Sequence, residues 1–244
     1  MKASLRLCAT LAFTAALLPA TVAFGQTAAP GFGKAGQFAI SGDRLFGLSW
    51  ESISTDQNGR KETQSFTSLS LLRSPMNIAE GNIIAGAYNA PRLSLDYFVI
   101  DGLSVGGSLG YFSISGHNKQ EQAGVSAEAD TGSFSGFLIA PRVGYAYMFT
   151  DMLGIWPRGG ITYLTGSSKN NNGDETASLN RFAFSLDAPL VISPFPHMGF
   201  VVGPALDIGL AGSNKTHNPN TGVTTSIDAS SLNIALNAGL FVYF

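Results

Sequence analysis

Residues 232–244 read LNIALNAGLFVYF, and apolar side chains occupy every second position from Leu232 to Phe244. The positions between them hold mostly Asn, Ala and Gly. Successive side chains of a β-strand point to opposite faces, so this stretch has one apolar face and one small or polar face. A tilted strand needs about 9 to 11 residues to cross a bilayer, which this stretch exceeds. It therefore predicts a lipid-facing strand, with Phe241, Tyr243 and Phe244 in an interfacial aromatic girdle.

The same alternation recurs upstream. It covers residues 36–54, 92–99, 103–111, 143–149, 155–163, 181–192 and 200–210. Short connections such as Asp101-Gly102 alternate with long polar stretches, which lie at 116–131, 166–178 and 212–225. In outer-membrane barrels short turns face the periplasm and long loops face outside. Both termini of such a barrel lie in the periplasm, so the strand number is even. The pattern predicts an all-β fold, a transmembrane antiparallel up-and-down β-barrel of eight strands. Ten strands are the alternative if 63–72 and 78–87 both span.

The first residues resemble an export signal. Lys2 and Arg6 precede an uncharged run from Leu7 to Leu18, and Pro19 and small residues follow. This is the composition of a cleaved secretory signal peptide. We predict a signal peptide at 1–25, a short N-terminal periplasmic segment at 26–35 and an outer-membrane β-barrel at 36–244. A long first extracellular loop, about 55–89, is expected to carry its own short β segment.

Composition excludes several classes of protein. Only 12% of the residues are charged, about half the share in an ordinary soluble domain. Cys8, the one cysteine, lies in the predicted signal peptide, so the mature chain has no disulfide, thiolate metal site or cysteine nucleophile. Removing Lys2 and Arg6 leaves 12 basic against 16 acidic residues, which disfavours nucleic acid as a partner. After the predicted signal peptide, the longest uncharged run is 188–206, which contains four prolines and cannot form one continuous helix.

Charged side chains occur on the face opposite the apolar one. We predict an inward-facing set of Arg92, Asp96, Arg142, Arg158, Arg181, Asp187 and Asp207, with Asp43 and Glu51 as further members. One interpretation is a charge network that fills the lumen, and the other is a gated polar path or small-solute site. A soluble lipocalin-like barrel is disfavoured because it would keep its apolar face inside.

Arg44 does not fit the alternation. It shares its parity with Phe38, Phe46 and Trp50, and an arginine facing lipid at mid-bilayer costs about 2 to 4 kcal/mol. We therefore predict a β-bulge near Gly42 that turns Arg44 away from the lipid.

The histidines do not form a catalytic pattern. His117 and His217 fall in predicted long loops and His197 in a short turn, and none stands near a serine nucleophile or a second histidine in a recognisable motif. We predict no catalytic residues, no cofactor and no metal site, and hence no enzyme.

The signal peptide, the amphipathic strands and the ending Leu240-Phe241-Val242-Tyr243-Phe244 resemble the small OmpA/OmpX/OmpW-like outer-membrane β-barrel domains. The resemblance implies that Leu240, Val242 and Phe244 form an assembly signal read by the barrel assembly machinery. It further implies a monomer surrounded by outer-membrane lipid and lipopolysaccharide. The function expected first is a non-enzymatic envelope protein with a side-chain-filled lumen and exposed loops for envelope integrity or surface interaction. The alternative is an OmpW-type porin or transporter for small, including hydrophobic, solutes.

Overall fold

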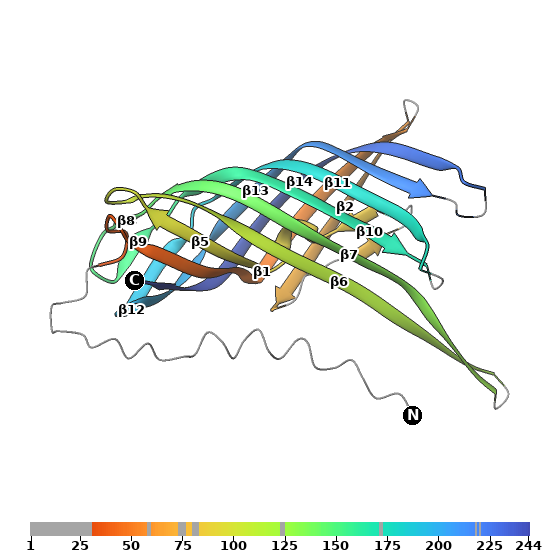
Figure 1. Ribbon diagram of the computed structural model, residues 1–244, viewed down its shortest axis with the longest axis horizontal. Helices are drawn as coiled ribbons and strands as arrows, with labels where there is room; N and C mark the ends of the chain where they lie inside the picture. Colours follow the sequence, from red (N-terminus) through yellow and green to blue (C-terminus); the bar gives the residue numbers. More distant parts are fainter. Residues whose placement is uncertain are drawn as a thin grey trace.

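The wall of the molecule is a closed antiparallel β-barrel (Figure 1). The computed structural model describes residues 31–57, 60–72, 77–79, 83–122, 125–170, 173–217, 219 and 221–244, and the side chains within them except those of 57, 60, 77–79, 83–85, 114–122 and 125–132. The predicted signal peptide lies outside these residues.

Eight strands cross the barrel wall, and we call each of them a stave. Three of the staves are interrupted and therefore carry two strand labels. In chain order they are β1 (Phe38–Gln57), β5 (Arg92–Phe98), β6 (Leu103–Gln122), β7 (Val125–Tyr145) with β8 (Tyr147–Met148), β9 (Leu153–Ile155) with β10 (Arg158–Lys169), β11 (Glu175–Asp187) with β12 (Leu190–Phe195), β13 (Met198–His217), and β14 (Thr224–Tyr243). Each stave pairs with the next, and pairing of β1 with β14 closes the ring. The eight-strand prediction is confirmed.

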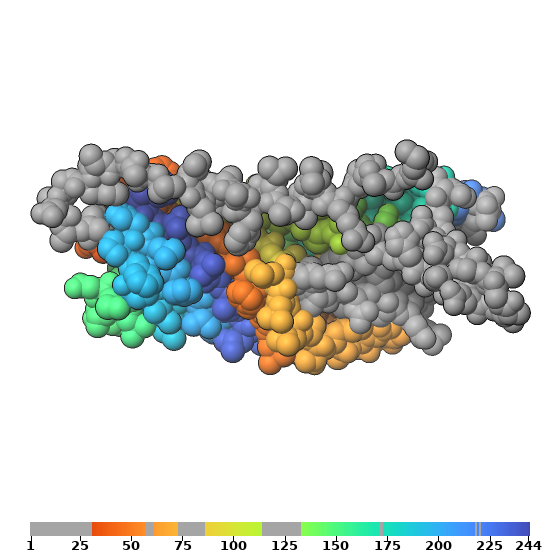
Figure 2. Space-filling view, turned by 90° about the horizontal axis from the view of Figure 1, so that it is seen from below, coloured from red at the N-terminus to blue at the C-terminus, as the bar shows by residue number. Residues whose placement is uncertain are grey.

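The closing seam joins the first and last staves. Ala39 pairs with Tyr243, and the register continues to Asp56 opposite Asp228. At one end of the seam, the backbone N–H of Phe38 donates to the carbonyl of Phe244 at 2.9 Å, and the N–H of Phe244 donates to the carbonyl of Phe38 at 3.0 Å. Figure 2 shows β13, β14, β1 and β2 side by side on one face, in the order of their pairing.

The two ends of the barrel differ in the length of their connections. The tight turns, with β8, β9 and β12, lie at the left of Figure 1, and we name this the turn end. The other end, the hairpin end, carries the β6–β7, β10–β11 and β13–β14 hairpins. β6 has 20 residues and β7 has 21, well above the roughly 9 to 11 that cross a bilayer. The polar stretches predicted as loops are therefore mainly paired strand, because backbone pairing continues beyond the lipid-facing positions.

The first long connection contains more structure than a loop. β2 (Arg60–Leu71) pairs with the outer half of β1, from Phe46 opposite Leu71 to Gln57 opposite Arg60, and in the described part of the chain it pairs with no other strand. Two short strands, β3 (Asn77–Ala79) and β4 (Ile83–Ala85), pair with each other. A short 3-10 helix, η3 (Ala87–Asn89), leads into β5. β5 pairs with the part of β1 nearest the turn end, from Phe38 to Asp43.

The predicted bulge in β1 is confirmed. The register with β14 shifts between Gly42 and Phe46, and Arg44 adopts a left-handed backbone conformation with φ 55°. The arginine is 5% exposed, so the bulge places its side chain in the lumen instead of against lipid. Within the described residues, no helix is both long and apolar enough to cross a membrane.

Candidate functional site

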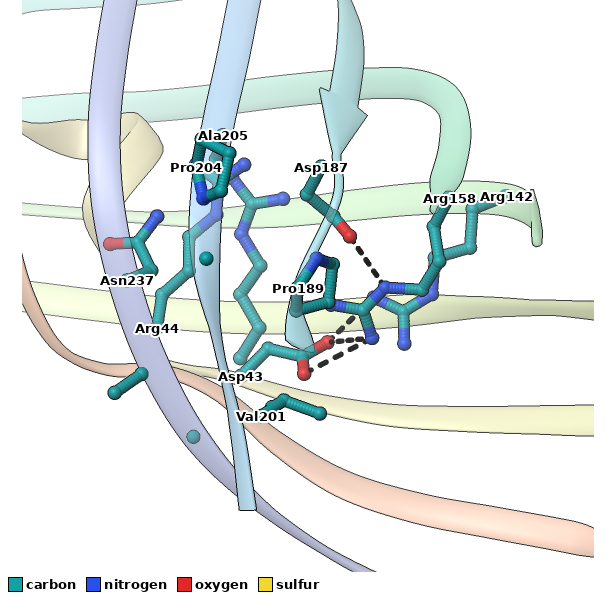
Figure 3. Close-up of a pocket in the computed structure, with 14 residues that line it drawn as sticks. Asp43, Arg44, Arg142, Arg158, Asp187, Pro189, Val201, Pro204, Ala205 and Asn237 are labelled. Atoms are coloured by element: carbon teal, nitrogen blue, oxygen red, sulfur yellow. Dashed lines mark hydrogen bonds and ion pairs between the residues drawn. The ribbon is translucent and has the colours of Figure 1, made fainter. Parts of the chain in front are cut away.

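The middle of the lumen contains a layer of paired charges. Arg142 of β7 bridges two carboxylates, with Nη1 2.6 Å from Asp43 and Nη2 2.5 Å from Asp96. Arg158 of β10 contacts Asp43 at 3.3 Å and Asp187 at 2.6 Å. Figure 3 shows Arg142 and Arg158 next to each other and pointing toward Asp43. Two arginines and three carboxylates thus link five staves across the barrel.

A second ion pair is made possible by the bulge in β1. Arg44 donates to both carboxylate oxygens of Asp207, at 2.8 and 3.1 Å. Ser185 and Asn233 donate to the same carboxylate at 2.6 and 2.8 Å. Asp207 is fully buried, and these bonds supply the partners that a buried carboxylate requires.

The seven charged positions proposed for the lumen all have side chains at least four-fifths buried. The network also includes Asp43 and Glu51, together with Arg44. The described part of the lumen therefore has five arginines and five carboxylates, and these are Arg44, Arg92, Arg142, Arg158, Arg181, Asp43, Glu51, Asp96, Asp187 and Asp207.

The segment before β5 folds into the lumen on the hairpin side of this layer. Ala87, Tyr88 and Asn89 are buried. The Tyr88 carbonyl accepts from Arg44 Nη1 and from Arg92 Nη2, both at 2.6 Å. Asn89 exchanges side-chain hydrogen bonds with Asn233, and Glu51 accepts from the backbone N–H of Gly86. The sequence reasoning placed this segment in an extracellular loop, because nothing local to residues 86–90 shows that it turns inward.

An aromatic cluster closes the turn end. Phe32, 2% exposed, lies with its ring centroid within 5.3 Å of the rings of Phe98, Trp156, Phe241 and Tyr243. The guanidinium of Arg158 lies 4.7 Å from the Trp156 ring, which joins this cluster to the charged layer.

Two details of this cluster differ from the sequence-based prediction. Phe241 and Tyr243 are 1% and 4% exposed, so placing them in an interfacial girdle is wrong. Their parity matches that of Asn233, which faces inward, and parity outweighs the aromatic character. Trp156 was not predicted, although it shares its parity with Arg158. Phe32 precedes the first strand and had no pattern to identify it.

Apolar side chains fill the lumen toward the hairpin end. The buried cluster there consists of Ala87, Ala90, Phe112, Phe134, Leu138, Ala140, Leu164 and Leu179. The Phe112 and Phe134 rings stack with centroids 5.8 Å apart. The lumen is thus occupied at three levels, by aromatic rings, by charges and by a second apolar cluster.

Small cavities remain beside the charged layer. One offers about 30 Å³ of room for the centres of water-sized spheres and is lined by residues including Asp43, Arg44, Arg158 and Asn237 (Figure 3). A water molecule requires about 10 to 15 Å³ on this measure, so the cavity holds about two.

The two histidines whose side chains the structure describes, His197 and His217, lie at opposite ends of the barrel. His197 Nδ1 is 2.9 Å from the Tyr243 carbonyl oxygen at the turn end, and His217 Nδ1 is 3.0 Å from Thr224 Oγ1 at the hairpin end. The side chain of His117 lies outside the described set. Among the described residues, no group of three His, Cys, Asp or Glu side chains is arranged to hold a metal ion.

The outer surface of the barrel is apolar. On β5, Leu93 and Leu95 are 66% and 52% exposed, whereas the intervening Ser94 and the following Asp96 are buried. Leu109, Leu236 and Leu240 continue this surface on other staves. Buried charges in the lumen and apolar side chains over the outer surface are the inverse of a water-soluble barrel. The fold is a transmembrane β-barrel of the outer-membrane type.

Comparison with solved structures finds barrels of the same kind. OprG of Pseudomonas aeruginosa has a TM-score of 0.49 and 14% identity, covering 86% of this chain and 97% of that one. AlkL, determined in lipid bilayers, has a TM-score of 0.47 and 12% identity, covering 91% and 96%. The outer-membrane protease OmpT of Escherichia coli has a TM-score of 0.46 and 9% identity, covering 90% and 99%. No family model and no curated relative matches this chain.

Proposed function

We propose that this chain is a non-enzymatic protein of the outer membrane, whose filled barrel anchors exposed hairpins for envelope integrity or surface interaction. The observation that carries the proposal is the lumen, which is occupied at three successive levels along its axis. A barrel of eight strands is just wide enough for side chains to fill, and here they do so. The barrel then serves as an anchor, and its accessible parts are the hairpins.

The proposal assigns a side of the membrane to each end. The turn end faces the periplasm and the hairpin end faces the exterior, as in barrels of this class. Outer-membrane lipid surrounds the wall, lipopolysaccharide contacts the hairpins, and the protein is a monomer. Leu240, Val242 and Phe244, which are 40%, 42% and 61% exposed, present an apolar edge on β14 to the barrel assembly machinery.

Ion conduction tests this proposal directly. The purified chain is reconstituted in planar lipid bilayers, with a porin of known conductance as the positive control. Silence in repeated reconstitutions that contain verified folded protein is the expected result, because three filled levels interrupt any axial water path. Steady discrete openings would overturn the filled-barrel function and favour a transport role.

A further inference from the structure

The lumen charges balance in number but not in position. Four of the five arginines have a carboxylate partner, since Arg44 pairs with Asp207, Arg181 pairs with Glu51, and Arg142 and Arg158 share the other three acids. Arg92 has no carboxylate within ion-pairing distance in the described part of the chain. Among the described residues, its one hydrogen-bond acceptor is the Tyr88 carbonyl, to which Arg44 also donates.

Arg92 is therefore a buried cation without a direct ion-pair partner among the described residues. The residue is 6% exposed, and its Nε atom is buried with no hydrogen-bond partner. A guanidinium removed from water destabilises a protein unless an anion and acceptors are supplied. Arg44, its neighbour at the Tyr88 carbonyl, has the same sign of charge and increases this cost.

A cavity lies against Arg92. It offers about 20 Å³ of room for the centres of water-sized spheres. Its wall includes three arginines, Arg92, Arg142 and Arg158, against one carboxylate, Asp187. Ser108 also lines it, and the Ser108 hydroxyl oxygen is a second buried polar atom without a partner.

We propose that this cavity is a binding site for one small monovalent anion of halide size, held by Arg92 and the Ser108 hydroxyl. The volume suits one such ion, because about 10 to 15 Å³ holds one water molecule. A free N–H of a guanidinium and a free hydroxyl are both donors that an anion accepts. The site belongs to the lumen and is independent of whatever the surface hairpins contact.

Bromide substitution locates the ion. Crystals of the full barrel grown with sodium bromide are measured at the bromine absorption edge. The expected result is one anomalous peak between Arg92 and Ser108 in the wild-type protein and no peak there in Arg92→Met. Absence of the peak from the wild-type protein would mean that the cavity holds only water, and the proposal would be wrong.

Unfolding measurements in solution give the second readout. Chloride is compared with gluconate, which is too large for the cavity, at equal ionic strength. Chloride raises the unfolding temperature of the wild-type barrel, whereas Arg92→Met loses this response and, in gluconate, unfolds at a higher temperature than the wild type. A chloride response retained by Arg92→Met would contradict the site.

A serine pair keeps the test decisive if Arg92→Met does not fold. Ser108 and Ser41 are both buried, and the hydroxyls of both lack a partner, but Ser41 lines neither cavity. Ser108→Ala is expected to weaken the apparent chloride affinity about tenfold, the effect of one hydrogen bond to a charged group. Ser41→Ala is expected to respond to chloride as the wild type does. Equal responses of the two variants would count against the proposal.

Discussion

Asp207 accepts four hydrogen bonds from three side chains in the lumen. Arg44, Ser185 and Asn233 all donate to it, and no part of it reaches solvent. Replacing one partner of a buried ion pair leaves the other charge without compensation, which typically costs 3 to 5 kcal/mol. The arrangement makes Asp207 the acceptor on which the bulged conformation of β1 depends.

Asp207→Asn should therefore lower the free energy of unfolding by about 3 kcal/mol, because Arg44 loses its counter-charge. Urea unfolding in lipid vesicles, followed by tryptophan fluorescence, measures this. Asp228→Asn is the control, since Asp228 is exposed on β14 and a surface change of this kind stays within about 0.5 kcal/mol. A loss for Asp207→Asn no larger than for Asp228→Asn would contradict the role assigned to the pair.

Single residues show how far sequence reasoning reaches. The sequence predicts that Arg44 turns away from the lipid, because an arginine at a lipid-facing position carries a large energetic cost, and the structure shows that it turns inward. The inward positions of Phe241 and Trp156 were also encoded by parity. No local sequence pattern shows the partner of each arginine. Asp43 and Arg142, for example, are brought together only by closure of the barrel.

At the scale of elements, the segment from Gly31 to Gln37 covers the lumen at the turn end. The side chain of Gln37 accepts from the backbone N–H groups of Gly33 and Lys34, which fixes the loop. Lys34 and the backbone of Ala35 bind Asp101 in the β5–β6 turn. These donors hold the pKa of Asp101 below its usual value. Phe32 then lies over Trp156 within the aromatic cluster.

Phe32→Ala should open this end of the lumen to water. Because the chain has two tryptophans, a Trp50→Phe background leaves Trp156 as the reporter. Its emission is expected to shift to longer wavelength in Phe32→Ala, as water replaces the missing ring. Phe195→Ala, at an exposed position of β12 near the same end, is the control and should leave the emission unchanged. An unshifted spectrum in Phe32→Ala would show that the segment from Gly31 to Gln37 does not exclude water from the lumen.

The outer part of the β6–β7 hairpin should be dispensable for folding. Replacing residues 116–131 with a tight turn keeps the paired segment from Leu103 opposite Tyr145 to Ser115 opposite Ser133, which still exceeds the roughly 9 to 11 residues needed. Heat-modifiable migration on gels is expected to persist, while any surface role of the hairpin is lost. As the contrasting change, removing residues 105–108 with 140–143 deletes Arg142 of the charged layer and the lipid-facing Val105 and Val143, and should abolish the folded form.

Element boundaries were harder to predict than the elements themselves. The alternation of lipid-facing residues ends where the bilayer ends, so it gives no information on strands that continue into water, such as the outer halves of β6 and β7. Residues 86–90 fold into the lumen because Glu51, Asn233 and two arginines supply partners for their polar groups. Those partners come from distant staves, and no local pattern contains them.

At the scale of the whole molecule, closure depends on a seam between the two ends of the barrel wall. Phe38 and Phe244 exchange both backbone hydrogen bonds there. In lipid an unpaired strand edge is costly, because no water is present to satisfy its polar groups. Phe244 therefore has two separable attributes, a backbone that completes the seam and an exposed aromatic ring that the assembly hypothesis assigns to recognition in the cell.

Two variants of Phe244 separate these attributes. Deleting Phe244 removes the paired backbone, so the yield of heat-modifiable barrel should fall both in cells and on refolding into lipid vesicles. Phe244→Leu keeps the backbone pair and an apolar side chain, so refolding into vesicles should equal the wild type while assembly in cells falls. Equal loss for Phe244→Leu in both settings would assign the ring to barrel stability, and unchanged assembly in cells would remove Phe244 from the proposed signal.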